Sequence, residues 1–75
     1  MYEPSDKDSK AIENNFVYHA PKDGQSARYE ALRHEVKGLA TYLVHNCPPS
    51  RELSLALTNL EQVMFWANSS IARNE

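Results

Sequence analysis

The chain has 75 residues, of which 41% are hydrophobic and 24% are charged, with only two glycines and four prolines. This length allows one domain, and the composition excludes collagenous, low-complexity and wholly disordered proteins. The net charge of −2 argues against a broad surface for duplex DNA, which normally carries an excess of basic residues. No stretch approaches the roughly 18 consecutive apolar residues of a membrane span, and the first residues lack the features of a secretory signal. We therefore expect a cytosolic protein that binds neither duplex DNA nor membranes.

Residues 1–15 are expected to form a flexible, solvated tail, because they are rich in polar and charged residues and show no sustained apolar period. Residues 16–19 follow as a short extended segment that Pro21 closes, since the residue before a proline is disfavoured from helical geometry. Residues 22–24 are typical of a turn. The folded domain is thus expected to span residues 16–75.

Two amphipathic helices are predicted after this turn. In residues 25–46 apolar side chains recur at steps of three and four, which is the pattern of a helix with one buried face. Pro48 and Pro49 end this helix, and Ser50 is the expected N-cap of a second helix over residues 51–73. The apolar stripe of the first helix consists of Tyr29, Leu32, Val36, Leu39 and Leu43, widened by Ala40 and Val44. The stripe of the second helix consists of Leu53, Leu57, Leu60, Met64, Ala67 and Ile71.

The second helix carries more apolar surface than one partner helix covers. Leu55 and Trp66 lie on a face other than the main stripe, with Phe65 between the two faces. A two-helix chain of this size has little core to offset the conformational entropy lost on folding. We therefore expect an all-α fold, in which an antiparallel helical hairpin follows an extended N-terminal segment. The surplus apolar surface predicts a homo-oligomer.

Phe16, Tyr18 and His19 form the first candidate site. Aromatic rings next to a helix N-terminus combine stacking surfaces with backbone N–H groups that attract anions. A nucleobase linked to a phosphate would use both features. The alternative is that Phe16 and Tyr18 only clamp the tail onto the hairpin.

Cations on the first helix form the second candidate site. Arg33 and Lys37 are four residues apart and share a face, and Tyr29 precedes Arg33 by four residues. A guanidinium group binds phosphate oxygens in a bidentate manner. The alternative is ordinary surface charge paired with glutamates of the same helix. Arg28 fits this alternative less well, because a cation in the first turn opposes the helix dipole.

Catalysis is not indicated by the sequence. It contains no Ser-His-acid set, no glycine-rich phosphate loop and no paired-carboxylate motif. The three histidines are scattered along the chain, and the single cysteine, Cys47, has no partners at zinc-ligand spacing. We therefore expect no enzyme activity, no metal site and no cofactor.

Several ordered blocks of sequence resemble the small phage anti-CBASS sponge proteins. They are residues 16–21 (FVYHAP), Gln25, 28–33 (RYEALR), 47–48 (CP), 50–52 (SRE), 56–61 (ALTNLE), 66–68 (WAN) and 71–74 (IARN). The resemblance covers residues 16–75. The hairpin is also similar to that of phage Thoeris-inhibiting sponges, which capture cyclic ADP-ribose-type signals.

This resemblance implies a homohexamer that acts in the cytoplasm of the host bacterium. It would bind the cyclic oligonucleotides of CBASS immunity, such as 3′,3′-cGAMP and cyclic tri-AMP, and hold them uncleaved so that effectors are not activated. The implied cyclic dinucleotide pocket, shared between protomers, would use Phe16, Tyr18, His19, Gln25, Tyr29 and Arg33. In this pocket Tyr18 would stack on a base and Arg33 would hold a phosphate. His19 and Gln25 would contact polar edges, and the other two residues would support them. A separate cyclic trinucleotide site would use Asn68 and Arg73.

Two other functions remain open at this point. A structural or adaptor oligomer would need no small ligand. A binder of single-stranded nucleic acid would prefer longer oligonucleotides and lose affinity steeply with salt. A sponge would instead prefer a closed cyclic ligand over its linear form.

Overall fold

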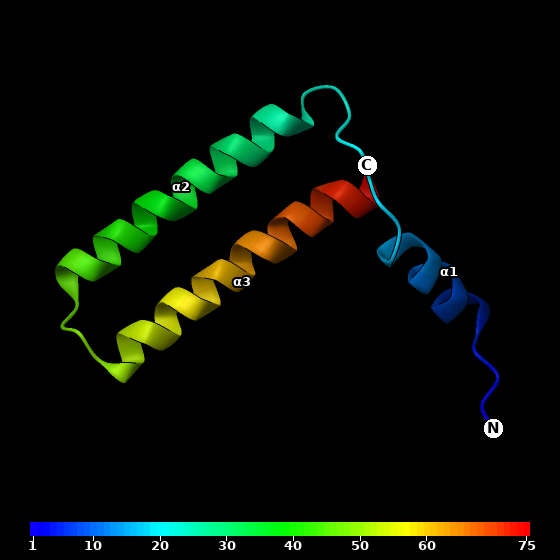
Figure 1. Ribbon diagram of the computed structural model, residues 1–75, viewed down its shortest axis with the longest axis horizontal. Coiled ribbons are helices and arrows are strands. Elements are labelled where there is room, and N and C mark those ends of the chain that lie inside the picture. Colours follow the sequence, from blue (N-terminus) through cyan, green and yellow to red (C-terminus); the bar gives the residue numbers. More distant parts are fainter.

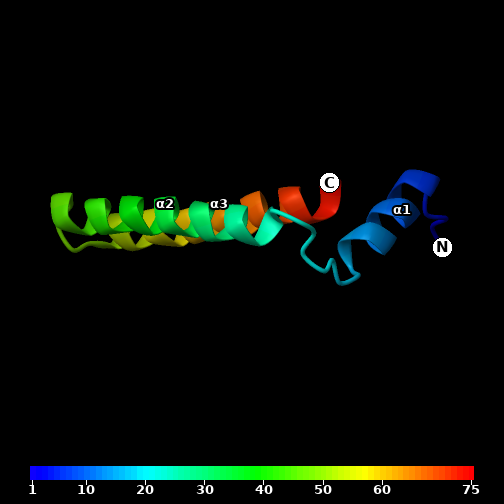
Figure 2. The ribbon, with the colours of Figure 1, turned by 90° about the horizontal axis from the view of Figure 1, so that it is seen from above.

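Three helices and no strand make up the protein (Figure 1). The computed structural model describes all 75 residues, and the helices are α1 (Asp6–Asn15), α2 (Gln25–Asn46) and α3 (Arg51–Asn74). Figure 1 shows α2 and α3 side by side and antiparallel, and Figure 2 shows that the two lie in one thin layer with α1 beyond their open end. The molecule is flat, with extents of 49 × 38 × 13 Å. The expected all-α helical hairpin is therefore confirmed.

A short turn between α2 and α3 closes the hairpin. The N–H of Cys47 donates to the carbonyl of Leu43 at 2.9 Å and completes the last turn of α2. Two prolines then prevent the helix from continuing, since proline has no N–H to donate. Ser50 caps α3 as expected, because its side-chain oxygen accepts from the N–H of Leu53 at 3.1 Å.

The two helices meet along the apolar stripes predicted from the sequence, but they bury these stripes only partly. The half-buried residues of the two stripes are Tyr29, Leu32, Val36, Ala40 and Leu43 on α2 and Leu53, Leu57, Leu60, Met64, Ala67 and Ile71 on α3. The expectation that Leu39 and Val44 belong to the buried stripe is wrong, because their side chains are 48% and 52% exposed. Both stand at the edges of the stripe, and a single partner helix covers only its centre.

No apolar side chain of the chain is fully buried. α3 also carries Leu55 and Trp66 on another face and Phe65 at the edge of its contact with α2, and Trp66 is 65% exposed. Tyr42 on α2 is exposed to a similar degree. One partner helix offers one covering surface, so the second apolar face of α3 faces solvent in a single copy. Assembly into a homo-oligomer stays a prediction, and this exposed surface favours it.

Residues 6–15 form the helix α1, whereas the sequence predicts only a solvated tail there. Ser5 caps it, since its side chain accepts from the N–H of Asp8 at 3.0 Å. Asp6 and Asp8 stand in the first turn, where the helix dipole favours anions. Apolar periodicity alone does not reveal such capping signals. No residue of α1 is buried, and the flexibility of this segment and the domain boundary at residue 16 stay predictions.

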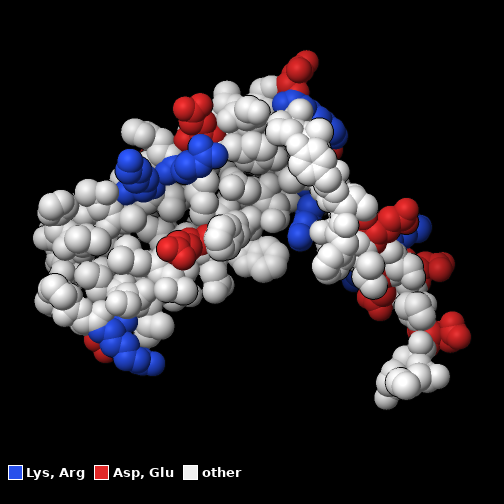
Figure 3. Space-filling model, viewed as in Figure 1, with Lys and Arg blue, Asp and Glu red and all other residues white.

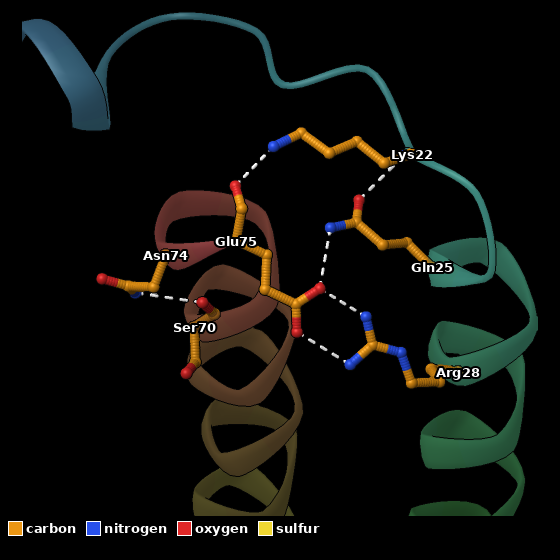
Figure 4. Close-up of polar contacts among 6 residues, drawn as sticks. All are labelled: Lys22, Gln25, Arg28, Ser70, Asn74 and Glu75. Carbon is orange, nitrogen blue, oxygen red and sulfur yellow. Dashed lines mark hydrogen bonds and ion pairs between the residues drawn. The ribbon is translucent and has the colours of Figure 1, made fainter.

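At the open end of the hairpin, Glu75 joins the end of α3 to the start of α2 (Figure 4). Its carboxylate accepts from both terminal nitrogens of Arg28, at 2.8 Å for Nη1, and from Gln25 Nε2 at 3.1 Å. The Lys22 ammonium donates to a main-chain oxygen of Glu75. We call these four residues the Glu75 clasp. Gln25, at 3% exposed, is the one buried residue of the chain.

The Glu75 clasp makes the stability of the fold depend on pH. Hydrogen bonds from Arg28 and Gln25 lower the pKa of Glu75 from 4.5 to about 2. A carboxylate whose pKa is lower in the folded state adds stability above its unfolded pKa and loses it as the pH falls through the folded pKa. We expect the native protein to melt at a higher temperature than Glu75→Gln at about pH 6. That difference should vanish as the pH falls from 4.5 to about 2, as measured by circular dichroism at constant protein concentration.

Glu30→Gln is the matched control for this measurement. The Glu30 side chain lies exposed on α2 and forms no ion pair. Its melting temperature relative to the native protein should therefore stay constant over the same pH range. A constant difference for Glu75→Gln as well would contradict the role of the clasp in stability.

Candidate functional site

The segment between α1 and α2, residues 16–24, is irregular and carries the aromatic residues of the first candidate site; we call it the arm. Phe16 is 82% exposed and Tyr18 is 85% exposed. In a single copy this exposure excludes the alternative that the two rings clamp the N-terminal segment onto the hairpin. The faces of such exposed rings are available for stacking on a planar base.

His19 and Gln25, the two expected polar contacts, are already engaged within the chain. The Nε2 atom of His19 lies 2.7 Å from the main-chain oxygen of Asn14, so a proton on Nε2 makes this a hydrogen bond and leaves Nδ1 as an acceptor. Gln25 donates to Glu75 and accepts from the N–H of Lys22 at 2.9 Å. In a single copy Gln25 is therefore a buried structural residue, and only His19 keeps a free polar atom for a ligand.

Lys22 and Arg28, the cations nearest the start of α2, have a partner in the chain's own carboxylate. Both bind Glu75, and the Arg28–Glu75 contact is the one ion pair of the structure. Its hydrogen bonds also raise the pKa of Arg28. An anion supplied by the end of α3 thus offsets the unfavourable position of Arg28 near the positive end of the dipole of α2. The glutamates of α2, the alternative partners, form no ion pair.

Arg33 and Lys37 stand at the rim of an open groove between α2 and α3. Figure 3 shows Lys and Arg side chains over the middle of α2 and an acidic side chain over the facing part of α3. The groove has a volume of about 320 Å³, and Glu61 and Phe65 line it from α3. Its remaining lining is apolar and consists of Val36, Ala40, Leu57, Leu60 and Met64. An apolar groove with two cations at its edge suits a ligand that combines planar rings with phosphates.

The groove adds Lys37, Glu61 and Phe65 to the surroundings of Arg33. Lys37 carries a sequence signal, because it shares a helix face with Arg33. Glu61 and Phe65 follow from the register between the two helices, which the sequence pattern alone does not fix. Tyr29, one turn before Arg33, is half-buried on α2 and does not line the groove.

Arg73 and Asn68, assigned to a second site, do not lie in one hollow. Arg73 is half-buried at a shallow hollow of about 420 Å³ on α3, which Gln62, Phe65, Trp66 and Ser69 also line. Asn68 does not line this hollow, and its buried Oδ1 atom has no hydrogen-bond partner. Residues five positions apart on a helix point about 140° away from each other, which separates the two side chains.

The residues assigned to the dinucleotide pocket do not converge in one copy. Arg33 lies eight residues into α2, about 12 Å from its start. The arm leaves that start in the direction of α1 and away from the middle of the hairpin (Figures 1 and 2). In a single copy, Tyr18 and Arg33 therefore belong to two separate surfaces, one aromatic and one cationic.

Two further findings concern metal binding and membrane crossing. No group of three or more His, Cys, Asp and Glu side chains is placed to hold a metal ion. None of the three helices has the length and apolar character that crossing a membrane requires.

Comparison with protein families identifies the hairpin. Residues 8–72 match the model of the hairpin domain of Acb2/Tad1. Searches of curated proteins and of solved structures gave no match. The matched residues include nearly all of the three helices and every assigned site residue except Arg73. The match covers well over half of the chain and confirms the resemblance to the anti-CBASS sponges, so the chain belongs to the Acb2/Tad1 hairpin family.

Proposed function

We propose that this protein binds cyclic oligonucleotide signals of bacterial CBASS defence in the host cytoplasm and holds them without cleaving them. Sequestration of these signals would keep the defence effectors inactive during phage infection. The observation that carries the proposal is the match of residues 8–72 to the Acb2/Tad1 hairpin family. We expect cyclic dinucleotides such as 3′,3′-cGAMP as ligands, and cyclic trinucleotides such as cyclic tri-AMP at a separate site near Arg73.

The two surfaces of the chain suit the two parts of such a ligand. The exposed rings of Phe16 and Tyr18 can stack on bases, and each stacked base contributes about 1–3 kcal/mol to binding. The guanidinium of Arg33 forms no ion pair within the chain and can bind a phosphate through two hydrogen bonds. The apolar groove beside Arg33 is lined by Met64 and Phe65 and can cover a ribose or base.

A complete pocket would combine Tyr18 of one copy with Arg33 of another. In one copy the arm points away from the groove, so neither surface alone offers both a stacking ring and a phosphate-binding group. The exposed apolar residues of α3, including Trp66, supply surface for the association that such a pocket needs. We propose that the assembly is a homohexamer with pockets shared between protomers.

A depletion experiment tests the function directly. Purified protein is mixed with cyclic di- and trinucleotides or, separately, with their linear forms, the mixture is filtered, and the filtrate is assayed for each ligand. The retained protein is then denatured by heat, and the released material is chromatographed. Depletion followed by recovery of the intact ligand is the expected result. Altered products would indicate an enzyme instead, and equal depletion of the linear forms would indicate a binder of single-stranded nucleic acid.

Tyr18→Ala and Arg33→Ala should each weaken cyclic dinucleotide binding strongly. Loss of one stacked base or of a bidentate phosphate contact costs on the order of 10- to 100-fold in affinity. Arg51→Ala is the matched control, since Arg51 is an exposed arginine at the start of α3, at the opposite end of the hairpin from the arm. Isothermal titration calorimetry measures the affinities. Unchanged affinity in the double variant Tyr18→Ala/Arg33→Ala would show that these residues do not form the site.

Mixed oligomers distinguish a shared pocket from one that lies within a single copy. Tyr18→Ala and Arg33→Ala are co-expressed with different tags, and doubly tagged oligomers are isolated. If the pocket is shared, random assembly restores both residues in about a quarter of the sites. If both residues act from the same copy, no site is restored.

Co-expression of the double variant with the native chain is the control for this experiment. A shared pocket leaves about a quarter of the sites intact, whereas a pocket within one copy leaves about half. Calorimetry measures the number of tight sites per chain in each mixture. Failure of the single-variant mixture to recover any tight sites would contradict the shared pocket.

A further inference from the structure

Residues at the end of α3 and directly after it hold the arm at both of its ends. At the end that follows α1, Asn14 Nδ2 donates to the main-chain oxygen of Arg73 at 3.1 Å, and His19 bonds to the main-chain oxygen of Asn14 at 2.7 Å. At the end that enters α2, Lys22 and Gln25 bond to Glu75. The arm is therefore suspended between two attachments, and both depend on residues 73–75.

The attachment at Lys22 is the more extensive of the two. The N–H of Lys22 donates to Gln25 Oε1 at 2.9 Å, and the N–H of Gln25 donates to the carbonyl of Lys22 at 3.0 Å. Gln25 Nε2 in turn donates to Glu75 Oε1 at 3.1 Å, so Gln25 links the arm to Glu75. The Arg28 guanidinium grips the same carboxylate and fixes its orientation. The Glu75 carboxylate is thus the one acceptor that ties the last residues of the arm to α2 and α3 together.

Tyr18 lies between these two attachments and has almost no packing of its own. Its side chain is 85% exposed, and the backbone of residues 18–22 forms no regular structure. Packing therefore does not hold the ring in place, and its position depends on where the arm is anchored. A ligand that stacks on Tyr18 would pay less ordering entropy if the arm were already fixed.

We infer that Glu75 is a positioning residue for the ligand site: its carboxylate fixes the arm, and thereby sets the affinity for ligands that stack on Tyr18, without contacting them. This inference rests on the proposed function for its ligand, but the fixing of the arm is a property of the free protein. Glu75 differs in this respect from Arg33, which has no partner in the chain and is assigned to direct contact.

Hydrogen exchange of the ligand-free protein tests the fixing of the arm. In Glu75→Gln the amides of Lys22 and Gln25, whose hydrogen bonds belong to the clasp, should exchange roughly tenfold faster, because the clasp opens more often. The amides in the middle of α2 and α3 should keep their rates. Glu30→Gln is the control and should leave the arm unchanged. An arm that exchanges at the native rate in Glu75→Gln overturns the inference.

A charge-swapped variant separates positioning from general destabilisation. Arg28→Glu/Glu75→Arg reverses the ion pair and leaves the main-chain oxygen of residue 75 to accept from Lys22. Glu75→Gln and Glu75→Arg should each bind 3′,3′-cGAMP roughly tenfold more weakly than the native protein. The swapped variant restores an ion pair but leaves Gln25 Nε2 without its carboxylate acceptor, so it should regain melting temperature while the arm still exchanges fast and the ligand still binds weakly. A swapped variant whose arm exchanges as slowly as the native arm would overturn the inference as well. Single variants that loosen the arm but bind at native affinity overturn the inference.

The two proposals fail in different ways. If the native protein binds none of the cyclic oligonucleotides, the proposed function is overturned together with the ligand part of this inference. The exchange experiment still decides whether Glu75 fixes the arm. If the native protein binds a cyclic oligonucleotide and the Glu75 variants bind it with the same affinity, the proposed function stands and the positioning role is overturned.

Discussion

Two antiparallel helices can cover only one face of each other, and most features of this protein follow from that limit. The apolar stripes of α2 and α3 meet, yet none of their side chains becomes fully buried. Packing between the two helices therefore adds little to the stability of the hairpin, and interactions at its two ends fix its geometry. At one end, two prolines and the Ser50 cap fix the turn. At the other end the Glu75 clasp ties the helices together, and its Gln25 is buried at low cost because both parts of its amide are hydrogen-bonded.

The same limit links assembly to ligand binding. Apolar surface that the partner helix leaves exposed is available for contact with other copies. The arm and the groove are available to bind a ligand between such copies. The proposed pocket between copies would be built from rigid helices and one anchored arm. Most of its ordering cost would be met by assembly, before any ligand arrives, which is what tight sequestration of a scarce signal requires.

The parts of the fold that local sequence determines are those that the sequence predicts. The bounds of α2 and α3, the seam between them and the Ser50 cap rest on periodicity and capping over a few residues. The exposed rings of Phe16 and Tyr18 also agree with a ligand-facing arm. By contrast, Glu75 and Arg28 are 47 residues apart in the sequence, and no local pattern predicts their contact. Phe65 and Glu61 line the same groove as Arg33 because of the register between the two helices, which no local pattern predicts either.

Gly38, in the middle of α2, extends the argument from one copy to several. A glycine inside a helix costs up to about 1 kcal/mol relative to alanine. Apart from the adjacent residues and the surrounding backbone of α2 itself, nothing lies within 4 Å of the position that a Cβ atom would occupy there, so packing within one copy does not require this glycine. Gly38 and the exposed Tyr42 are four residues apart and share a face of α2. A helix backbone of another copy could approach this face closely, which would give the glycine a use that the isolated hairpin lacks. If the proposed assembly forms, the face of α2 around Gly38 would thus contribute to it beside the apolar surface of α3.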